Sequence, residues 1–371
     1  MYTPNSAIWE TTLRCNFSCS HCGSDAGLSR ARELDTSEGL SLIRDLAEIS
    51  CKNVCLMGGE PFLRPDWERL AQEVIDYGME LSFVSNGWFV QDIIPALTKL
   101  EPMVVGISLD GNQEIHDTIR QADSFKRAMK SLLSLRENNI EATAITTVSK
   151  RNYNCLPYLR RVLAGREIGW QIQVAVPMGR FDQDFLISPE EFYALGLFLV
   201  DSRKRYGLRN LPIAGGHCLG YYSYAIPGSR LWTGCVAGKE TIGIASDGGI
   251  RGCLAIPSTQ TIANIRTTPL REIWEDDRSF PFTRLFDKTM LGANCQDCPH
   301  GEICKGGCSS MSYGLTGRFN NNPYCFYRIE RALSPNHNIS RILVDRLTTI
   351  LWKVLNKKRG QQTSHERLSR P

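Results

Sequence analysis

Two periodicities alternate along the first half of the chain. Short runs of apolar and β-branched residues are typical of buried strands, and longer segments with apolar residues every three or four positions are typical of amphipathic helices. Asp35 and Glu38 have the spacing of a helix capping box. Leu40, Ile43 and Ala47 would share one face of that helix. The pattern predicts strands over residues 7–13, 54–57, 81–84, 103–109, 141–148 and 170–176, and further helices over residues 67–77, 93–100, 124–138 and 156–163.

Strands that alternate with helices are expected to be parallel, with right-handed crossovers. Six such units fall short of a closed eight-fold barrel, so we predict an α/β fold with an open, partial (β/α)6 barrel over residues 1–185. In such sheets the chemistry lies at the carboxyl ends of the strands. Four segments end or follow predicted strands and should meet at one mouth: residues 15–22, 58–60, 85–87 and 108–111.

The pattern changes after about residue 185. A helix over 189–206 is expected within a helical bridge, 186–217, that leads into a loop-rich region, 218–330, punctuated by glycine and cysteine. Little in that region suggests a hydrophobic core of its own, so bound metal is expected to hold it together. The remainder, 331–371, combines an amphipathic helix over 339–355 with a polar, basic and flexible tail.

Composition and charge narrow the class of protein. The chain of 371 residues is 42% hydrophobic, as expected for a packed globular protein. No stretch approaches the roughly 18 apolar residues of a membrane span, and the first residues lack a secretion signal, so we expect a cytoplasmic protein. From Arg328 onward the net charge is +7, which leaves −3 for the body and argues against a nucleic-acid-binding body. The basic helix could contact a membrane or an acidic peptide, although packing on the body is commoner.

Fourteen cysteines are many for a reducing compartment, where clustered cysteines usually indicate metal binding or catalysis. Cys15, Cys19 and Cys22 could wrap one face of a cubane cluster. Iron–sulfur clusters usually take four cysteine ligands, so three leave one iron free to bind a substrate or cofactor. The alternative is a zinc site with His21 as the fourth ligand.

The spacing of these cysteines, together with three later strand-end motifs, resembles the radical S-adenosylmethionine (radical SAM) superfamily. The motifs are Met57-Gly58-Gly59-Glu60-Pro61, Ser85-Asn86-Gly87 and Ser108-Leu109-Asp110-Gly111. The resemblance implies that Cys15, Cys19 and Cys22 bind a [4Fe–4S] cluster whose free iron binds S-adenosylmethionine. It also implies cofactor contacts from the following residues: His21 near the adenine; Gly58, Gly59, Glu60 and Pro61 at the amino group; and Ser85, Asn86, Ser108 and Asp110 at the ribose and carboxylate.

The implied activity is reductive cleavage of the cofactor to methionine and a 5′-deoxyadenosyl radical, which abstracts hydrogen from a substrate. Glycines in the Gly58-Gly59 turn would let the cofactor approach the backbone. Arg120 could reach the cofactor carboxylate or form a surface salt bridge.

The later cysteines resemble the pattern of SPASM domains, which follow radical domains in peptide- and protein-modifying enzymes. The resemblance implies two auxiliary [4Fe–4S] clusters, and therefore three clusters in all. The ligands would be Cys218, Cys235, Cys253 and Cys308 for the first, and Cys295, Cys298, Cys304 and Cys325 for the second. If Cys218 is not a ligand, the first auxiliary cluster has an open iron. An auxiliary cluster could accept the electron that is lost when the substrate radical forms its product.

The resemblance favours a peptide maturase that crosslinks, epimerises or similarly oxidises a peptide. Cys253 is followed by Leu254 rather than the aspartate expected in sulfatase-maturing relatives. Only 14 residues precede Cys15, so a leader-binding domain is expected to be absent, fused elsewhere or replaced by a separate protein. The expected electron donor is a flavodoxin or ferredoxin. Oxidation of a small molecule or haem-pathway tetrapyrrole is the enzymatic alternative, and a non-catalytic iron–sulfur electron-transfer protein is disfavoured by the cofactor turn.

The sequence names no catalytic acid or base. Cys51, Cys55 and Cys155 are expected to be buried structural thiols. Gln171 and Gln173 alternate on the last predicted strand, where they either face the mouth or support the fold.

Overall fold

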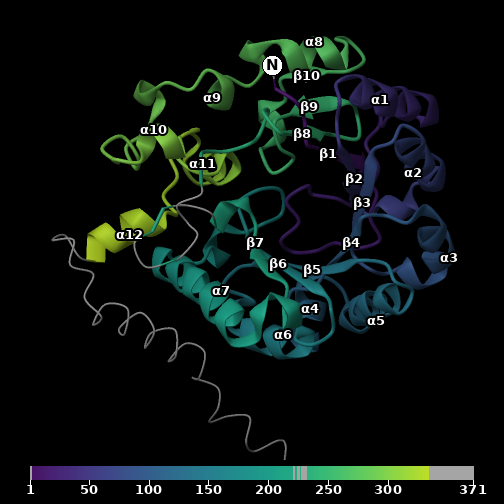
Figure 1. Cartoon of the computed structure of the whole chain (residues 1–371), viewed down its shortest axis with the longest axis horizontal. Helices are drawn as coiled ribbons and strands as arrows, with labels where there is room; N and C mark the ends of the chain where they lie inside the picture. The colour runs from purple at the N-terminus through teal and green to yellow at the C-terminus, as the bar shows by residue number, and fades with distance from the viewer. Residues whose placement is uncertain (1, 220–221, 224–225, 227–231, 334–371) are drawn as a thin grey trace, which may run out of the picture.

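A computed structural model describes residues 2–219, 222–223, 226 and 232–333 (Figure 1). The helix predicted over 339–355 and the basic tail lie outside these described residues. No helix in the described ranges is long and apolar enough to cross a membrane.

All six predicted strands form, and they belong to one ten-stranded sheet in the order β10-β9-β8-β1-β2-β3-β4-β5-β6-β7. The strands from β8 to β7 in this order run parallel, whereas β9 and β10 are antiparallel additions at one edge. The first six are β1 Ser6–Thr12, β2 Asn53–Gly58, β3 Glu80–Ser85, β4 Val104–Ser108, β5 Ala142–Val148 and β6 Gly169–Val174.

Helices cover the outer side of this curved sheet in Figure 1. They are α1 Thr36–Glu48, α2 Trp67–Asp76, α3 Val90–Leu100, α4 Gln113–Ile119, α5 Ser124–Glu137, α6 Leu156–Leu163 and α7 Pro189–Asn210. Helix α4 was not predicted, because it has only seven residues and follows β4 almost directly. The capping box at the start of α1 is confirmed: the Glu38 N–H donates to Asp35 Oδ1 and the Asp35 N–H donates to Glu38 Oε2, both at 2.9 Å.

The buried face of α1 differs slightly from the predicted one. Leu42, Ile43 and Leu46 are fully buried. Leu40 and Ala47, which were expected beside Ile43, are only half-buried and pack at the border of the core. The buried face of α1 is therefore displaced around the helix axis from the predicted face by about one residue position.

The predicted partial barrel with its six strands is present, and the second half of the chain adds four further strands to the sheet among the described residues. They are β7 Ile213–Gly215, β8 Thr241–Ile244, β9 Gly249–Arg251 and β10 Ala263–Asn264. β7 pairs with β6 and β8 pairs with β1, both in parallel. These strands have only two to four residues, too few for a visible alternation of apolar and polar positions. Within the described residues, the sheet therefore contains eight parallel strands, and strands of the carboxyl-terminal region extend it.

The carboxyl-terminal region contributes buried apolar side chains to the main core. Trp274, Phe280, Phe282, Met311 and Phe326 are all at most 7% exposed and join the main core. The helices that carry or flank them are α8 Leu270–Glu275, α9 Pro281–Arg284, α10 Gly301–Cys304, α11 Ser309–Thr316 and α12 Phe326–Leu333. Apolar burial therefore contributes to holding this region together, whether or not metal also does.

Helix α7 joins the two halves of the molecule. It continues beyond the predicted end through a break at Gly207, where φ is +65°. Phe192 of α7 stacks on Phe326 of α12 with ring centroids 4.8 Å apart. The Tyr193 hydroxyl donates to the buried carboxylate of Glu330 at 2.9 Å. These contacts fix α12, and with it Cys325, against the barrel.

Truncating the core beneath α2 should destabilise the fold. Leu70 is fully buried against the α1–α2 interface, so Leu70→Ala should lower the free energy of unfolding by roughly 2–5 kcal/mol through lost burial and the cavity left behind. Leu208→Ala on α7, where the side chain is 62% exposed, is the matched control and should have little effect. Urea unfolding followed by tryptophan fluorescence measures both, and equal midpoints for the two variants would contradict this assignment of the core.

Candidate functional site

The cysteine loop begins directly after β1 and is closed at its base by the backbone. The Cys15 N–H donates to the Gly27 carbonyl at 2.9 Å, and the Gly27 N–H donates to the Leu13 carbonyl at 3.0 Å. Cys15, Cys19 and Cys22 thus lie on a closed loop at the carboxyl end of β1, as predicted. This position faces the ends of the other parallel strands.

Each of the three sulfurs is approached by an N–H donor. The Phe17 N–H donates to Cys15 Sγ and the Ala26 N–H donates to Cys22 Sγ, both at 3.4 Å. Arg120 Nη1 approaches Cys19 Sγ at 3.9 Å. Donors and cations of this kind stabilise thiolates, which are the metal-binding form of cysteine. Burial raises the pKa of the Cys15 thiol to about 11, and a bound metal cluster would favour its ionised form.

Among the described residues, no three His, Cys, Asp or Glu side chains form a group that could hold a single metal ion. A zinc site binds its ligands on one ion, whereas a four-iron cluster binds its thiolates on separate irons. Cys15, Cys19 and Cys22 have the donor chemistry of such a cluster.

The Gly58-Gly59 turn follows β2 and packs directly on the end of β1. A Cβ atom at Gly58, where φ is +151°, would lie 2.2 Å from the Thr12 carbonyl oxygen, and one at Gly59 would lie 2.3 Å from the Arg14 carbonyl oxygen. Contacts this short exclude any side chain. The prediction gave approach of the cofactor as the reason for these glycines. The structure adds a different one, which is backbone packing between β2 and the cysteine loop.

Glu60 is completely buried at the end of this turn. Its carboxylate accepts hydrogen bonds from the Ser85 hydroxyl and the Asn86 N–H, both at 2.8 Å. Burial raises the pKa of Glu60 to about 7, although these two donors lower it. No side chain in the described part of the chain forms an ion pair with it. A buried carboxyl group without a cationic partner suits a ligand that carries an amino group.

The end of β3 contacts the cysteine loop. Asn86 Nδ2 donates to Asn16 Oδ1 at 2.8 Å and lies 3.9 Å from Cys15 Sγ. Pro61 starts a short 3-10 turn, Pro61–Leu63, behind Glu60. Ser108 is half-buried at the last position of β4. The predicted residues from β2, β3 and β4 therefore gather around one mouth.

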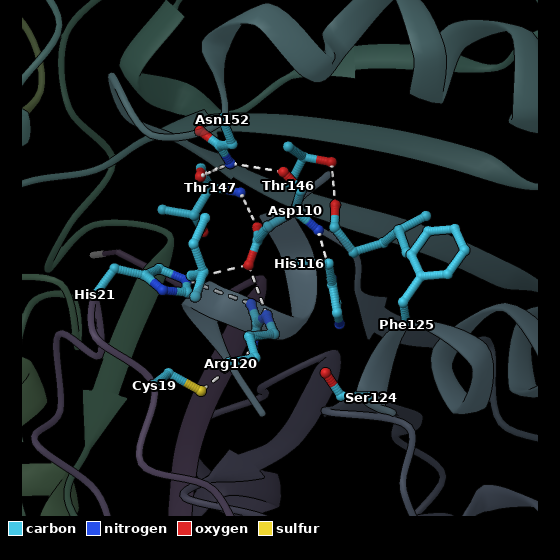
Figure 2. A network of polar contacts seen from close by, with 12 residues as sticks. Cys19, His21, Asp110, His116, Arg120, Ser124, Phe125, Thr146, Thr147 and Asn152 are labelled. Carbon is cyan, nitrogen blue, oxygen red and sulfur yellow. Dashed lines mark hydrogen bonds and ion pairs between the residues drawn. The ribbon is translucent and has the colours of Figure 1, made fainter. Parts of the chain in front are cut away.

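Asp110 lies at the centre of a buried polar network (Figure 2). Its Oδ2 accepts from Arg120 Nε at 2.6 Å and lies 3.3 Å from His21 Nε2, while its Oδ1 accepts from the Thr147 N–H at 2.9 Å. Burial by itself raises the pKa of Asp110, but Arg120 and His21 hold it well below its usual range. His116, whose Nδ1 accepts from the Asp110 N–H, is kept neutral because burial lowers its pKa to about 4.

This network changes the interpretation of two residues. Both oxygens of Asp110 are already engaged, so the carboxylate orients Arg120 and His21. Arg120 is only 10% exposed, which rules out the surface salt bridge considered from the sequence. His21 Nδ1 is buried and makes no hydrogen bond to the described residues, so it is available to a ligand.

A second group of thiols comes from the part of the chain that follows β7. Cys235 and Cys308 are hydrogen-bonded to each other. Cys253 is near enough to Cys235, and Cys218 near enough to Cys308, for their charges to interact. Cys218 follows β7 closely, where the Gly216 N–H donates to the Ile172 carbonyl of β6 at 2.7 Å. Cys218 thus lies close to Cys308, one of the other three thiols expected to bind the first auxiliary cluster.

The remaining four predicted ligands line a separate cavity of about 340 Å³. They are Cys295, Cys298, Cys304 and Cys325. Cys304 is near enough to the other three for their ionised thiolates to raise its pKa, which places the four thiols in one group. Both sets fit the donor chemistry of iron–sulfur clusters.

Comparison with known protein families decides the identity of these parts. Residues 9–160 match the model of the radical SAM superfamily, and residues 235–299 match the model of the SPASM iron–sulfur cluster-binding domain. The chain therefore contains a radical SAM domain followed by a SPASM domain. The first match includes every strand-end motif described above, and the second begins at Cys235.

Similar proteins extend over most of this radical SAM chain. An AdoMet-dependent heme synthase of Methanosarcina barkeri is 29% identical over 345 residues, which cover 88% of this chain and 97% of that protein. The mycofactocin maturase MftC of Mycolicibacterium smegmatis is 27% identical, over 84% of this chain and 79% of that protein. The structure of Streptococcus suis SuiB bound to precursor peptide SuiA matches with a TM-score of 0.71 at 16% identity, over 88% of this chain and 76% of that chain. This last likeness concerns the fold.

Four residues outside the predicted ligand sets have contacts within the fold: Cys51, Cys55, Cys155 and Gln173. Cys51 and Cys55 are buried on either side of the start of β2, and burial raises the pKa of each thiol to about 11. Cys155 Sγ is 3.7 Å from Asn112 Oδ1. Gln173 Nε2 donates to Thr147 Oγ1 at 3.0 Å, which supports the backbone next to Asp110.

Sequence analysis missed Arg180, which reaches the cysteine loop from the segment after β6. The only local signal was a Gly-Arg pair shortly after the last predicted strand. That pair is too common to be informative until the fold brings it to the site.

The Gly58-Gly59 packing gives a first prediction for this site. Gly59→Ala should reduce the iron bound by the cysteine loop and abolish cofactor cleavage, because the new methyl group must displace the backbone at Leu13 and Arg14. Gly27→Ala is the matched control, since a Cβ there meets nothing within 4 Å. Iron analysis and a 5′-deoxyadenosine assay measure both variants. A Gly59→Ala protein with normal activity would contradict the steric argument.

The position of Cys218 gives a second prediction. Cys218→Ala should leave the cysteine-loop signal intact and perturb only one auxiliary signal in the electron paramagnetic resonance (EPR) spectrum, because the thiol is grouped with Cys308. Cys55→Ala, which removes a buried thiol from β2, should leave all signals unchanged. An unaltered spectrum for Cys218→Ala would exclude it as a ligand.

Proposed function

We propose that this radical SAM protein is a cytoplasmic peptide maturase that oxidises a precursor peptide, with three [4Fe–4S] clusters and S-adenosylmethionine as cofactors. Cys15, Cys19 and Cys22 would bind the first cluster. The two auxiliary clusters would take the thiol sets that contain Cys218 and Cys325. A flavodoxin or ferredoxin would supply electrons, and a separate protein could bind the leader of the peptide.

The observation that supports this proposal is the separation of the thiol sets around one mouth. The cysteine loop lies at the end of β1, and Cys218 lies just beyond β7, which pairs with β6. A substrate between them would contact the radical source on one side and an electron acceptor on the other. Removal of a hydrogen atom followed by removal of one electron is a two-electron oxidation, so the arrangement suits oxidative maturation.

The residues of the mouth have separate tasks in this proposal. When bound, the cofactor and reduced cluster supply the carbon radical that removes a hydrogen atom from the substrate. Glu60 would bind the cofactor amino group, and Gly58, Gly59 and Pro61 would shape the turn that surrounds it. Ser85, Asn86 and Ser108 would contact the ribose and carboxylate. Asp110 would act through Arg120 and His21, whose free Nδ1 faces a ligand in this proposal.

A peptide substrate is supported by two of the similar proteins. MftC is a maturase by name, and SuiB has been crystallised with its precursor peptide. A tetrapyrrole is the second candidate, because the AdoMet-dependent heme synthase matches over 97% of its own length, against 79% for MftC. The two candidates differ in substrate and share the radical chemistry.

One experiment separates these substrates. The anaerobically loaded protein is incubated with reductant, S-adenosylmethionine and either a short peptide encoded beside its gene or iron-coproporphyrin III. Peptide maturation predicts loss of hydrogen or carbon dioxide from the peptide by mass spectrometry, matched to 5′-deoxyadenosine. Loss of carbon dioxide from the porphyrin alone would overturn the peptide proposal in favour of the second candidate.

Removing the cysteine-loop ligands gives a further prediction. The wild-type protein should hold about twelve irons per chain, and the Cys15, Cys19 and Cys22 triple alanine variant about eight, under the ligand logic of four-iron clusters. The variant should lose all cofactor cleavage. Cys51→Ala is the control, since this buried thiol belongs to neither set. Retained cleavage in the triple variant would refute the assignment.

A further inference from the structure

Arg180 follows β6 and reaches across the mouth of the sheet to the cysteine loop. Its backbone N–H donates to the Cys22 carbonyl at 3.0 Å, and its Nε donates to the Cys19 carbonyl at 3.2 Å. Its Nη1 donates to the Ala26 carbonyl and to the Asp25 carboxylate, both at 2.8 Å. One side chain thus contacts the loop on both sides of its last cysteine.

The neighbouring backbone fixes this arginine in place. Gly179 has φ of +56°, and a Cβ atom there would lie 2.3 Å from the Cys22 carbonyl oxygen and 2.7 Å from that of Gly23. The segment after β6 therefore packs backbone against backbone on the cysteine loop. Arg180 is held by this packing, unlike a mobile surface arginine, and it can act on the site at a defined distance.

One nitrogen of the guanidinium lacks a partner. Arg180 Nη2 is buried and makes no hydrogen bond within the described part of the chain. The Nε–H and one Nη2–H of a guanidinium point to the same side as a rigid fork. Nε donates to the Cys19 carbonyl, so the unpaired Nη2 donor lies on the same side of the guanidinium as that carbonyl. A buried charged donor without an acceptor is costly, which indicates a ligand at that place.

The charge of Arg180 is only partly compensated. Its carboxylate partner Asp25 is 65% exposed, so solvent screens much of that ion pair. Arg120, the other cation at Cys19, is instead paired with the fully buried Asp110. Cys15 and Cys22 have backbone donors to their sulfurs. Cys19 is therefore the cysteine of this loop that both Arg120 and Arg180 contact, and its surroundings are called the Cys19 corner below.

We propose that Arg180 donates its free Nη2–H to a sulfur atom of the cluster at the Cys19 corner and thereby raises the reduction potential of that cluster. The inference rests on the proposed function, because it requires the cluster at Cys15, Cys19 and Cys22. Hydrogen bonds to the sulfurs and nearby positive charge both favour the reduced, more negative cluster. Arg180 is then a positioning residue for the loop and sets how readily the cluster accepts an electron.

The test is a redox titration of the anaerobically loaded full chain, monitored by EPR. The signal to follow is the one that changes when S-adenosylmethionine is added. Arg180→Gln should give a more negative midpoint potential for this signal in the absence of the cofactor. Arg180→Lys, which keeps the charge but loses the fork, should shift it less. Both variants should leave the auxiliary signals at their wild-type potentials.

Arg151→Gln is the control for loss of charge alone. Arg151 contacts the same loop only through the Ser20 hydroxyl, at 3.1 Å, and should cause a smaller shift than Arg180→Gln. A fully loaded Arg180→Gln protein with the wild-type midpoint would refute the inference, as would a shift that appears only with the cofactor present. If the glutamine variant fails to hold the cluster, a loaded lysine variant with the wild-type midpoint refutes it instead. A wild-type protein without a cofactor-sensitive signal would refute the proposed function, which is a distinguishable failure.

Discussion

The site depends on one steric constraint, the contact between the Gly58-Gly59 turn and the carbonyl oxygens at the end of β1. These backbones approach so closely that no Cβ atom fits between them. The contact sets where β1 ends, and therefore where the cysteine loop begins. It also brings Glu60 to the ends of β3, where Ser85 and Asn86 hold it. Backbone packing therefore requires glycine at both positions of this turn, whether or not the turn also binds a ligand.

Electrostatic interactions explain which residues surround Cys15, Cys19 and Cys22. Three thiolates close together repel one another, and burial raises the pKa of the Cys15 and Cys19 thiols. The structure offsets this with N–H donors to the sulfurs and with Arg120, which buried Asp110 holds in place. In the proposed function, these donors and charges would serve both the assembly of the cluster and its reduction.

The SPASM region is continuous with the barrel in both the sheet and the core. β8 pairs with β1, the strand that leads to the cysteine loop, and β7 leads to Cys218. Stacking of Phe192 on Phe326 joins α7 to α12 close to Cys325. The thiol sets are thereby fixed relative to the mouth.

The sequence by itself determined the features that depend on local spacing. Periodicity predicted six strands and most helices, and the close spacing of Cys15, Cys19 and Cys22 predicted one thiol group, because neighbours along the chain decide both. The other two thiol sets were implied by the resemblance to SPASM domains, since their members lie far apart along the chain. Only the tertiary structure decided what depends on residues far apart. β7 and β8 are too short to be recognised without their partners β6 and β1. The orienting role of Asp110 and the reach of Arg180 arise from segments about 90 and 160 residues from the loop, which pack together only in the folded chain.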